Sequence, residues 1–295
     1  MDSTDSRRNR RSVTDRSPVG LRSLPSVDRL FDLTPIRAVS PAARRLLAGS
    51  SVYWRVAPAL HRRLRHHTEG YVDSPLDPFQ LYQVDPAAIR RFTGREFPVW
   101  ANRWRSIGRV RDGDWDRRQP PVSPTYEGPA PDFYLADTFE ETPLHRAMRA
   151  HFRDDVPWTE TAFVRRVLAK ATDPEAPSVW HECSSRAEVL DHCRSLDRLY
   201  ESLRNDGCVP ARRHETRYDD GLTMRGVMSN EILVDVGRDG TPLFVSGRHR
   251  LSLAKLLGLD TVPVAVAVRH PDCLRSDGPD GRSLAHPGEA IDVPW

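Results

Sequence analysis

The segment 231–268 constrains the fold more than any other, because short apolar runs and glycine-containing turns alternate there. Apolar runs of four to eight residues bounded by turn residues are typical of buried strands, whereas residues 251–257 are apolar at helical spacing. The expected elements are strand 231–236, hairpin turn 238–241, strand 242–245, helix 251–257 (ended by Gly258) and strand 262–268. Two strands followed by a helix and a further strand predict a mixed α/β (α+β) fold.

The turn Gly247-Arg248-His249-Arg250 separates the second strand of this segment from the helix. Backbone N–H groups in the first turn of a helix lack partners within the helix, and together with the helix dipole they favour an anion. Arginine side chains suit bidentate contacts to phosphate, and His249 can donate a hydrogen bond or transfer a proton near neutral pH. A phosphate-bearing ligand is therefore predicted here, bound by Gly247, Arg248, His249 and Arg250.

A structural role for the same arginines is the alternative. Three acidic residues lie on or beside the predicted hairpin, and any of them could bind and orient Arg248 or Arg250. They are Glu231, Asp235 and Asp239. The spacing of these residues leaves the two interpretations open.

Residues 245–259, followed by Val262-Pro263-Val264, resemble the signature of the ParB/sulfiredoxin superfamily, in which a G-x-(H/R)-R turn opens a helix before an I/V-P-V strand. Residues 81–89 are similar to the opening strand of that family, and residues 196–207 to the helix before its central strands. The resemblance implies a compact domain with a mixed sheet that binds a nucleotide phosphate at the turn. It also implies ATP, ADP or CTP with Mg²⁺ as cofactors, and phosphoryl transfer or nucleotide hydrolysis as the activity.

Departures from the family patterns narrow this expectation. Sulfiredoxins carry a cysteine where this chain has Arg248, so reduction of a sulfinic acid is not expected. Partition proteins continue into DNA-binding and dimerisation regions, whereas only 25 residues follow His270. The His249-Arg250 pair resembles the turn of kinase-like members, which phosphorylate a small molecule. The leading hypothesis is a kinase-like phosphotransferase or an NTPase that acts on an unknown small-molecule or protein acceptor.

A second candidate site is the acidic segment Asp112-Gly113-Asp114-Trp115-Asp116. Carboxylates at alternate positions can bind Mg²⁺, and one of them could act as a general base. We predict that Asp114 or Asp116 holds the metal or deprotonates the acceptor, while His249 orients the transferred group. The segment is no EF-hand, because the required glycine and glutamate are missing from their positions. The alternative is a turn in which the aspartates cap backbone N–H groups.

The four cysteines include no C-x-x-C pair, which excludes the common zinc-ribbon and thioredoxin motifs. Two of them lie near histidines, in the group His181, Cys183, His192 and Cys193. Zinc binds residues of these types, but their spacing matches no standard site, and a free cysteine is more often a buried apolar residue. Metal binding by this group is therefore the less favoured interpretation.

Charge is distributed unevenly along the chain. Residues 1–70 contain 14 arginines and 6 acidic residues, a net charge of +8, whereas the remainder carries a net charge of −5. A basic front suits an anionic partner, so DNA binding through residues 1–70 by a nuclease-like or partition-related protein is the main alternative function. A non-catalytic adaptor is the third possibility.

The chain is expected to divide into four parts. These are an Arg- and Ser-rich disordered tail 1–24, a helical basic extension 25–76, the ParB/sulfiredoxin-like domain 77–270 with an insertion at about 118–184, and a loop-like C-terminal tail 271–295. Within the domain a strand is predicted at 79–84, and helices at 141–152, 158–171 and 185–205. No apolar run approaches the roughly 20 residues that cross a bilayer, and no signal peptide is recognisable, so a cytoplasmic protein is expected.

Overall fold

The computed structural model of this chain describes most of the sequence from residue 70 onward. The described residues are 70–101, 103–171, 173, 180, 181, 183–210, 231–278 and 282–291. The predicted tail 1–24 and nearly all of the predicted extension 25–76 lie outside the described residues, as does the interpretation of residues 1–70 as a DNA-binding region.

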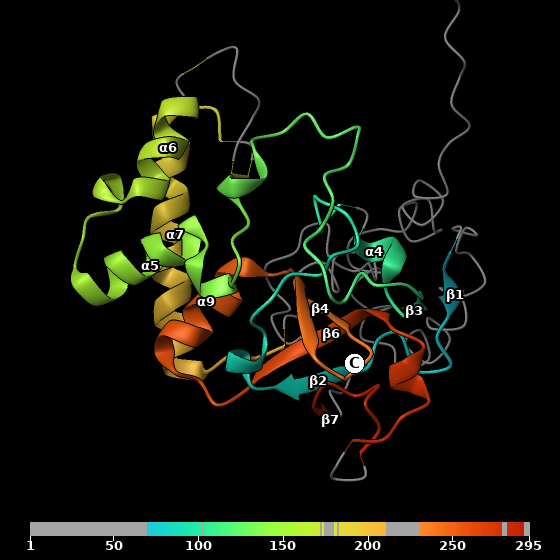
Figure 1. The fold of residues 1–295 in the computed structure, drawn as a ribbon. Helices are drawn as coiled ribbons and strands as arrows, with labels where there is room; N and C mark the ends of the chain where they lie inside the picture. Colours follow the sequence, from blue (N-terminus) through green and yellow to red (C-terminus); the bar gives the residue numbers. More distant parts are fainter. Residues whose placement is uncertain are drawn as a thin grey trace, which may run out of the picture.

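A seven-stranded mixed sheet forms the centre of the described chain (Figure 1). Its strands are β1 (Val72–Asp73), β2 (Leu81–Val84), β3 (Arg109–Val110), β4 (Ile232–Val236), β5 (Pro242–Ser246), β6 (Val262–Arg269) and β7 (Glu289–Ile291). The long strand β6 is central: β4 pairs with it in parallel, and it also pairs with β2 in antiparallel and β3 in parallel fashion. Outer strands complete the sheet, because β5 pairs with β4, β1 with β3 and β7 with β2.

Both faces of the central strands are buried, which explains why their sequences are almost uninterruptedly apolar. Successive side chains of a strand point to opposite faces of a sheet. Val234 and Val264 accordingly belong to the large core cluster shared with the helices, whereas Leu233 and Ala265 belong to a smaller cluster that includes Trp115. The sheet is thus covered on one face by helices and on the other by the loops around Trp115.

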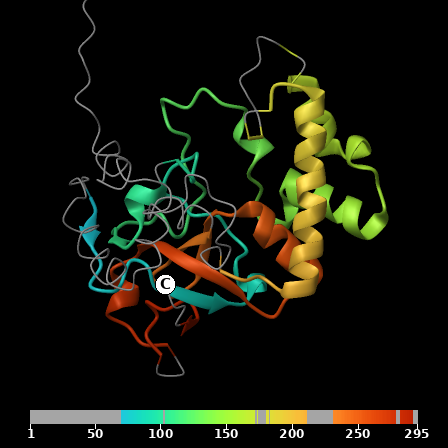
Figure 2. The same cartoon turned by 180° about the vertical axis from the view of Figure 1, so that it is seen from behind.

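Most of the described helices lie together beside the sheet, whereas the short α4 (Arg103–Ser106) lies apart from them, near β3 (Figure 1). The other described helices are α5 (Pro143–Asp154), α6 (Ala162–Ala171), α7 (Arg186–Asp206) and α9 (Arg248–Leu257), and the single 3₁₀ turns are Pro86–Ala88, Pro131–Phe133, Phe139–Glu141, Trp158–Glu160 and Asp272–Leu274. Figures 1 and 2 show α5, α6 and α7 as one group, with α9 between this group and the strands. The helix that follows the predicted phosphate-binding turn therefore connects the two parts of the molecule.

The long helix α7 begins and ends at the residues that the sequence indicates. The hydroxyl of Ser185 accepts a hydrogen bond from the backbone N–H of Glu188 (3.2 Å), which caps the first turn. Gly207 ends the helix with φ +70°. The two ends of α7 are therefore set by local capping, while its buried face is set by packing on α6 and α9.

The mixed α/β fold and the elements predicted over 231–268 are confirmed. The prediction of a loop-like C-terminal tail is wrong for residues 289–291, because these residues form β7 on the edge of β2. The strands β1 and β3 were not predicted, since a two-residue strand has no periodicity of its own. No helix within the described ranges is long and apolar enough to cross a bilayer.

Candidate functional site

The predicted turn connects β5 to α9, and its geometry requires glycine. Gly247 has φ +92°, a left-handed conformation that other residues rarely adopt. A Cβ atom there would lie 2.9 Å from the Cα of Ile232 at the start of β4. Leu251 donates the first hydrogen bond of the helix to the carbonyl of Gly247 (3.0 Å), so the N–H groups of residues 248–250 precede that ladder.

Arg248, the first residue of α9, is a half-buried cation held by aromatic rings. Its guanidinium carbon lies 4.3 Å from the ring centroid of Trp100 and 4.8 Å from that of Tyr134. Burial lowers the pKa of Arg248 from 12.5 to about 10, which leaves it charged at neutral pH. Within the described part of the chain, Arg248 makes no hydrogen bond or ion pair.

A small pocket adjoins Arg248. Its lining includes Tyr134, Thr142, Phe244, Arg248 and Ser252. The hydroxyl of Ser252 is buried and has no hydrogen-bond partner. Residues four positions apart lie on the same face of a helix, so Ser252 follows Arg248 along α9. Sequence reasoning missed Ser252, although this spacing from Arg248 was visible.

Arg250 has a structural role. Its guanidinium lies 3.3 Å from the fully buried carboxylate of Glu231 and also donates to the carbonyl of Val209 and the Sγ of Cys208. Burial alone would lower the pKa of Arg250, but its neighbours Cys208 and Glu231 outweigh burial and raise it. Arg250 therefore joins the start of α9 to the residues before β4 and after α7. Of the predicted phosphate-binding arginines, only Arg248 has a guanidinium available to a ligand.

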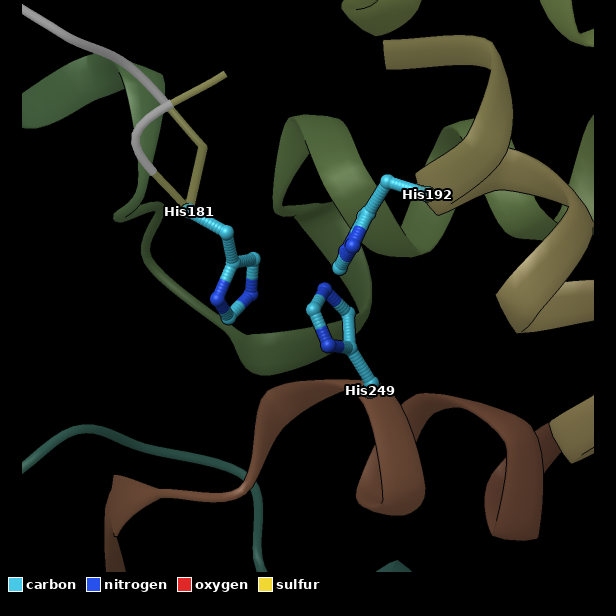
Figure 3. Close-up of side chains that lie close together, drawn as sticks. All are labelled: His181, His192 and His249. Atoms are coloured by element: carbon cyan, nitrogen blue, oxygen red, sulfur yellow. The ribbon is translucent and has the colours of Figure 1, made fainter. Parts of the chain in front are cut away.

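His249 points towards two other histidines (Figure 3). The ring centroids of His181 and His192 are 4.5 Å apart. The ring centroid of His249 lies 5.1 Å from that of His181 and 5.2 Å from that of His192. One ring nitrogen from each residue lies within 4.8 Å of the others. Burial lowers the pKa of His192 to about 4 and that of His249 well below its usual 6.5, so both imidazoles are neutral near pH 7.

Trp180 holds His249 in place. The indole Nε1–H of Trp180 donates a hydrogen bond to the Nε2 of His249 (3.2 Å), and its ring packs edge-on against His192 with the centroids 4.4 Å apart. Both Trp180 and the following His181 have positive φ values, 45° and 61°. The contact was not predictable, because residue 180 and α9 are brought together only by packing.

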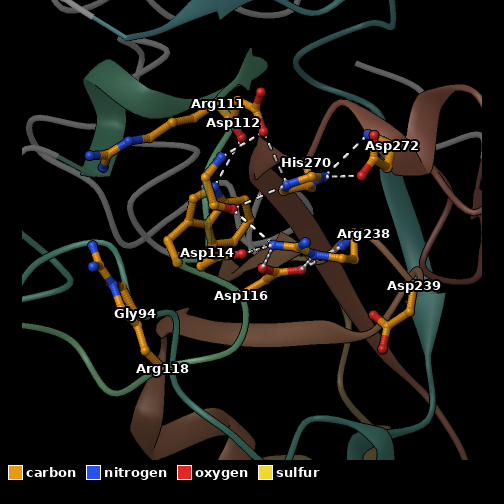
Figure 4. Close-up of polar contacts among 12 residues, drawn as sticks. Gly94, Arg111, Asp112, Asp114, Asp116, Arg118, Arg238, Asp239, His270 and Asp272 are labelled. Carbon is orange, nitrogen blue, oxygen red and sulfur yellow. Dashed lines mark hydrogen bonds and ion pairs between the residues drawn. The ribbon is translucent and has the colours of Figure 1, made fainter.

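The acidic segment lies at the other end of β5 from the turn. Asp116 accepts hydrogen bonds from the Nε (2.9 Å), Nη2 (2.8 Å) and backbone N–H (3.0 Å) of Arg238, and Asp114 accepts one from Nη2 (2.7 Å), as Figure 4 shows. Arg238 belongs to the turn between β4 and β5, whereas Gly247 follows the other end of β5. A five-residue strand spans about 13 Å between its end residues. The structure therefore does not bring Asp114 and Asp116 to the phosphate-binding turn.

Mg²⁺ does not fit the acidic segment as arranged. Both oxygens of Asp116 are hydrogen-bonded to one guanidinium, which occupies the positions that a cation would need. Trp115 is buried and donates from Nε1 to the carbonyl of Arg111 (2.9 Å), so it anchors the loop in the core. The acidic segment thus has a structural role: its aspartates bind Arg238 and fix the loop against the β4–β5 hairpin.

Cys183 and Cys193 are buried in the large core cluster. Burial raises the pKa of Cys193 to about 12, which keeps it a thiol, whereas zinc binds the thiolate. The sequence group of two histidines and two cysteines thus separates in space: the histidines meet His249, and the cysteines pack in the core.

A second pocket, of about 490 Å³ and larger than the one beside Ser252, lies among side chains of residues 71–127. Its lining includes Tyr71, Arg95, Arg111 and Tyr126. Tyr126 packs against Phe97, and Phe97 packs against Trp100, the ring that Arg248 contacts. Two aromatic contacts therefore connect this pocket to Arg248. The volume of the pocket lies in the range of small-molecule sites.

Comparison with known proteins yields no relative: the chain matches no family model, no curated protein and no solved structure. The resemblance to the ParB/sulfiredoxin superfamily thus rests on the sequence motif alone.

Proposed function

We propose that this protein binds a nucleotide through a ParB/sulfiredoxin-like domain, with a phosphate group at the first turn of α9. Arg248 carries the proposal. It is a half-buried cation at a helix N-terminus that makes no hydrogen bond or ion pair among the described residues. A partly buried charge is costly unless it is paired, and an anionic ligand would pair it.

The aromatic contacts of Arg248 also support a ligand at its guanidinium. The rings of Trp100 and Tyr134 attract the cation without accepting conventional hydrogen bonds, so they leave its five N–H donors to other partners. A phosphate accepts two of these donors at once and is also favoured by the backbone N–H groups that begin α9. The phosphate would therefore lie between the Arg248 side chain and the backbone N–H groups at the start of α9.

The pocket beside Tyr126 has room for the nucleoside part of the ligand. Phosphoryl transfer or nucleotide hydrolysis is the reaction class proposed, and in either case the residues of the turn act by positioning and by charge stabilisation. His249 is a neutral imidazole whose Nε2 accepts the Trp180 indole N–H, so it orients groups at the turn and does not carry positive charge.

Isothermal titration of the full chain with ATP, ADP and CTP, each with and without Mg²⁺, tests the proposal. We expect at least one nucleotide to bind, and Arg248→Ala to weaken that binding roughly 10- to 100-fold, because a charge-assisted contact is worth about 1.5–3 kcal/mol. Arg275→Ala is the matched control, since the Arg275 side chain is 74 % exposed. If no nucleotide binds, or if both variants bind as wild type does, the proposal is wrong.

Turnover is measured separately by phosphate release and by ³¹P NMR of the nucleotide. Product formation that is lost in Arg248→Ala supports an enzyme. Tight binding without any product, across a range of small-molecule acceptors, would instead make the protein a non-catalytic nucleotide-binding adaptor.

A further inference from the structure

The three histidines beside the turn come from three separate elements. His181 lies in the segment before α7, His192 lies on α7 itself, and His249 is the second residue of α9. Figure 3 shows the three imidazoles pointing towards one another. Three like side chains that meet from separate elements indicate a binding site more strongly than neighbours in sequence do, because three backbone segments must each be positioned to bring them together.

The spacing of the imidazoles approaches that of a metal site. Zinc–nitrogen bonds of about 2.0–2.1 Å at tetrahedral angles place the ligating nitrogens about 3.3 Å apart. In the structure one nitrogen of each residue lies within 4.8 Å of the others. Rotation of the side chains closes the remaining gap of about 1.5 Å at most, and the exposed His181 can move most readily.

Two further observations point to a ligand at this cluster. The Nε2 of His192 is buried and has no hydrogen-bond partner. Buried polar atoms of native proteins are nearly always hydrogen-bonded, so this unpaired nitrogen points to a ligand. Trp180 and His181 are consecutive non-glycine residues in the left-handed region, each costing about 1–3 kcal/mol. That backbone places the indole of Trp180 against His192 and His249 and presents His181 to both.

The donor set selects the kind of metal. Imidazole nitrogens suit Zn²⁺ and neighbouring transition metals, whereas Mg²⁺ and Ca²⁺ require oxygen ligands. Three histidines with a fourth position open to water are the pattern of reactive zinc centres, and the exposure of His181 leaves such a position accessible. Neutral imidazole is the form that binds metal.

We propose that His181, His192 and His249 form a site for one divalent metal ion of the zinc class. The metal site and the proposed nucleotide site both include residues of the turn, but the metal ligands do not include Arg248, the residue on which the nucleotide proposal depends. The Nε2 of His249 accepts a hydrogen bond from the indole N–H of Trp180, and a metal bound at this nitrogen would take the place of that hydrogen bond.

The test uses the full chain, expressed without a histidine tag and dialysed against excess chelator. Zn²⁺ is then titrated by calorimetry with a competing chelator, and bound metal is counted by elemental analysis. We expect one tightly bound equivalent in the wild type. His181→Ala should weaken this binding by at least about 100-fold, beyond the 10- to 100-fold seen for residues that only support a ligand. Because His181 is exposed, this variant leaves the core intact.

Two matched variants serve as controls. His286→Ala removes a histidine that packs against Tyr82, outside the cluster, and should retain the metal. Arg248→Ala should also retain it, which separates failure of this proposal from failure of the nucleotide proposal. Cobalt(II) bound by the wild type should show the visible absorption of a four-coordinate site. Absence of a tight equivalent, or equal affinity in wild type and His181→Ala, would overturn the assignment.

Discussion

At the scale of single residues, the two arginines of the turn have different surroundings although they are two positions apart. Arg250 pairs with the buried Glu231, whereas Arg248 lies against Trp100 and Tyr134. Successive positions on a helix differ by about 100° in direction, so side chains two positions apart point to different neighbours. The sequence shows that one of the nearby acids could pair with an arginine, but which pair forms depends on the packing of α9 on β4.

Gly247 allows a prediction at the same scale. Gly247→Ala should destabilise the fold by about 1–3 kcal/mol, because it strains a left-handed residue and also places Cβ against Ile232. Gly258→Ala, at the other end of α9, also places alanine in a left-handed conformation (φ +66°), but its Cβ would contact nothing within 4 Å. We therefore expect a smaller loss of stability for Gly258→Ala. Urea denaturation of both variants measures the difference. Equal losses would show that the approach of the turn to β4 is unimportant.

At the scale of elements, the acidic loop predicts a pH dependence of stability. Burial would raise the pKa of Asp116, but the hydrogen bonds from Arg238 outweigh burial and lower it from 3.8 to about 2. A carboxyl with a lowered folded-state pKa stabilises the fold above its unfolded pKa, and the contribution is lost as pH falls through the folded pKa. The window therefore runs from about pH 4 down to about pH 2 and involves about 2 kcal/mol.

Asp116→Asn should lower stability at pH 7 and flatten its dependence on pH within that window, as measured by urea denaturation at each pH. Asp114→Asn is the matched control, because Asp114 contacts the same Arg238 while its side chain is 75 % exposed, so its removal should change little. If the free energy of unfolding of Asp116→Asn depended on pH as steeply as that of the wild type, the effect would belong to other carboxyl groups.

The elements also show how far local patterns predict this fold. Residues 231–268 were predictable because each of their strands is buried on both faces and each boundary carries a turn residue. The strand β7 was missed because residues 289–291 are exposed or half-exposed and become a strand only through pairing with β2. The acidic loop was visible as a motif, but its partner Arg238 lies more than 120 residues away and could not be inferred.

At the scale of the whole molecule, the helical segment 143–171 and the sheet share one core. Trp158 and Phe163 of this segment belong to the same cluster as Val234 and Val264 of the central strands. We therefore expect the helices and the sheet to unfold together. Urea transitions followed by tryptophan fluorescence and by far-ultraviolet circular dichroism should coincide. Two separated transitions would show that the helical segment unfolds as an independent domain.

The histidine cluster illustrates the limit of sequence reasoning at this scale. His181 and His192 were recognisable as potential ligands, and His249 was recognisable in the turn. Nothing along the chain connects the two groups, because the contact depends on α7 packing against α9. The sequence grouped His181 and His192 with the nearby cysteines, which are buried in the core. The burial of the cysteines and the meeting of the histidines both depend on the folded chain, so neither could be inferred from spacing.

The contacts of Arg250 have a consequence for engineering. Its guanidinium bonds to Val209 and to Glu231, so both ends of the intervening 21 residues are fastened to one side chain. Arg250 is therefore a position to leave unchanged in any redesign of the turn, because its substitution would release the residues after α7 and before β4 at the same time.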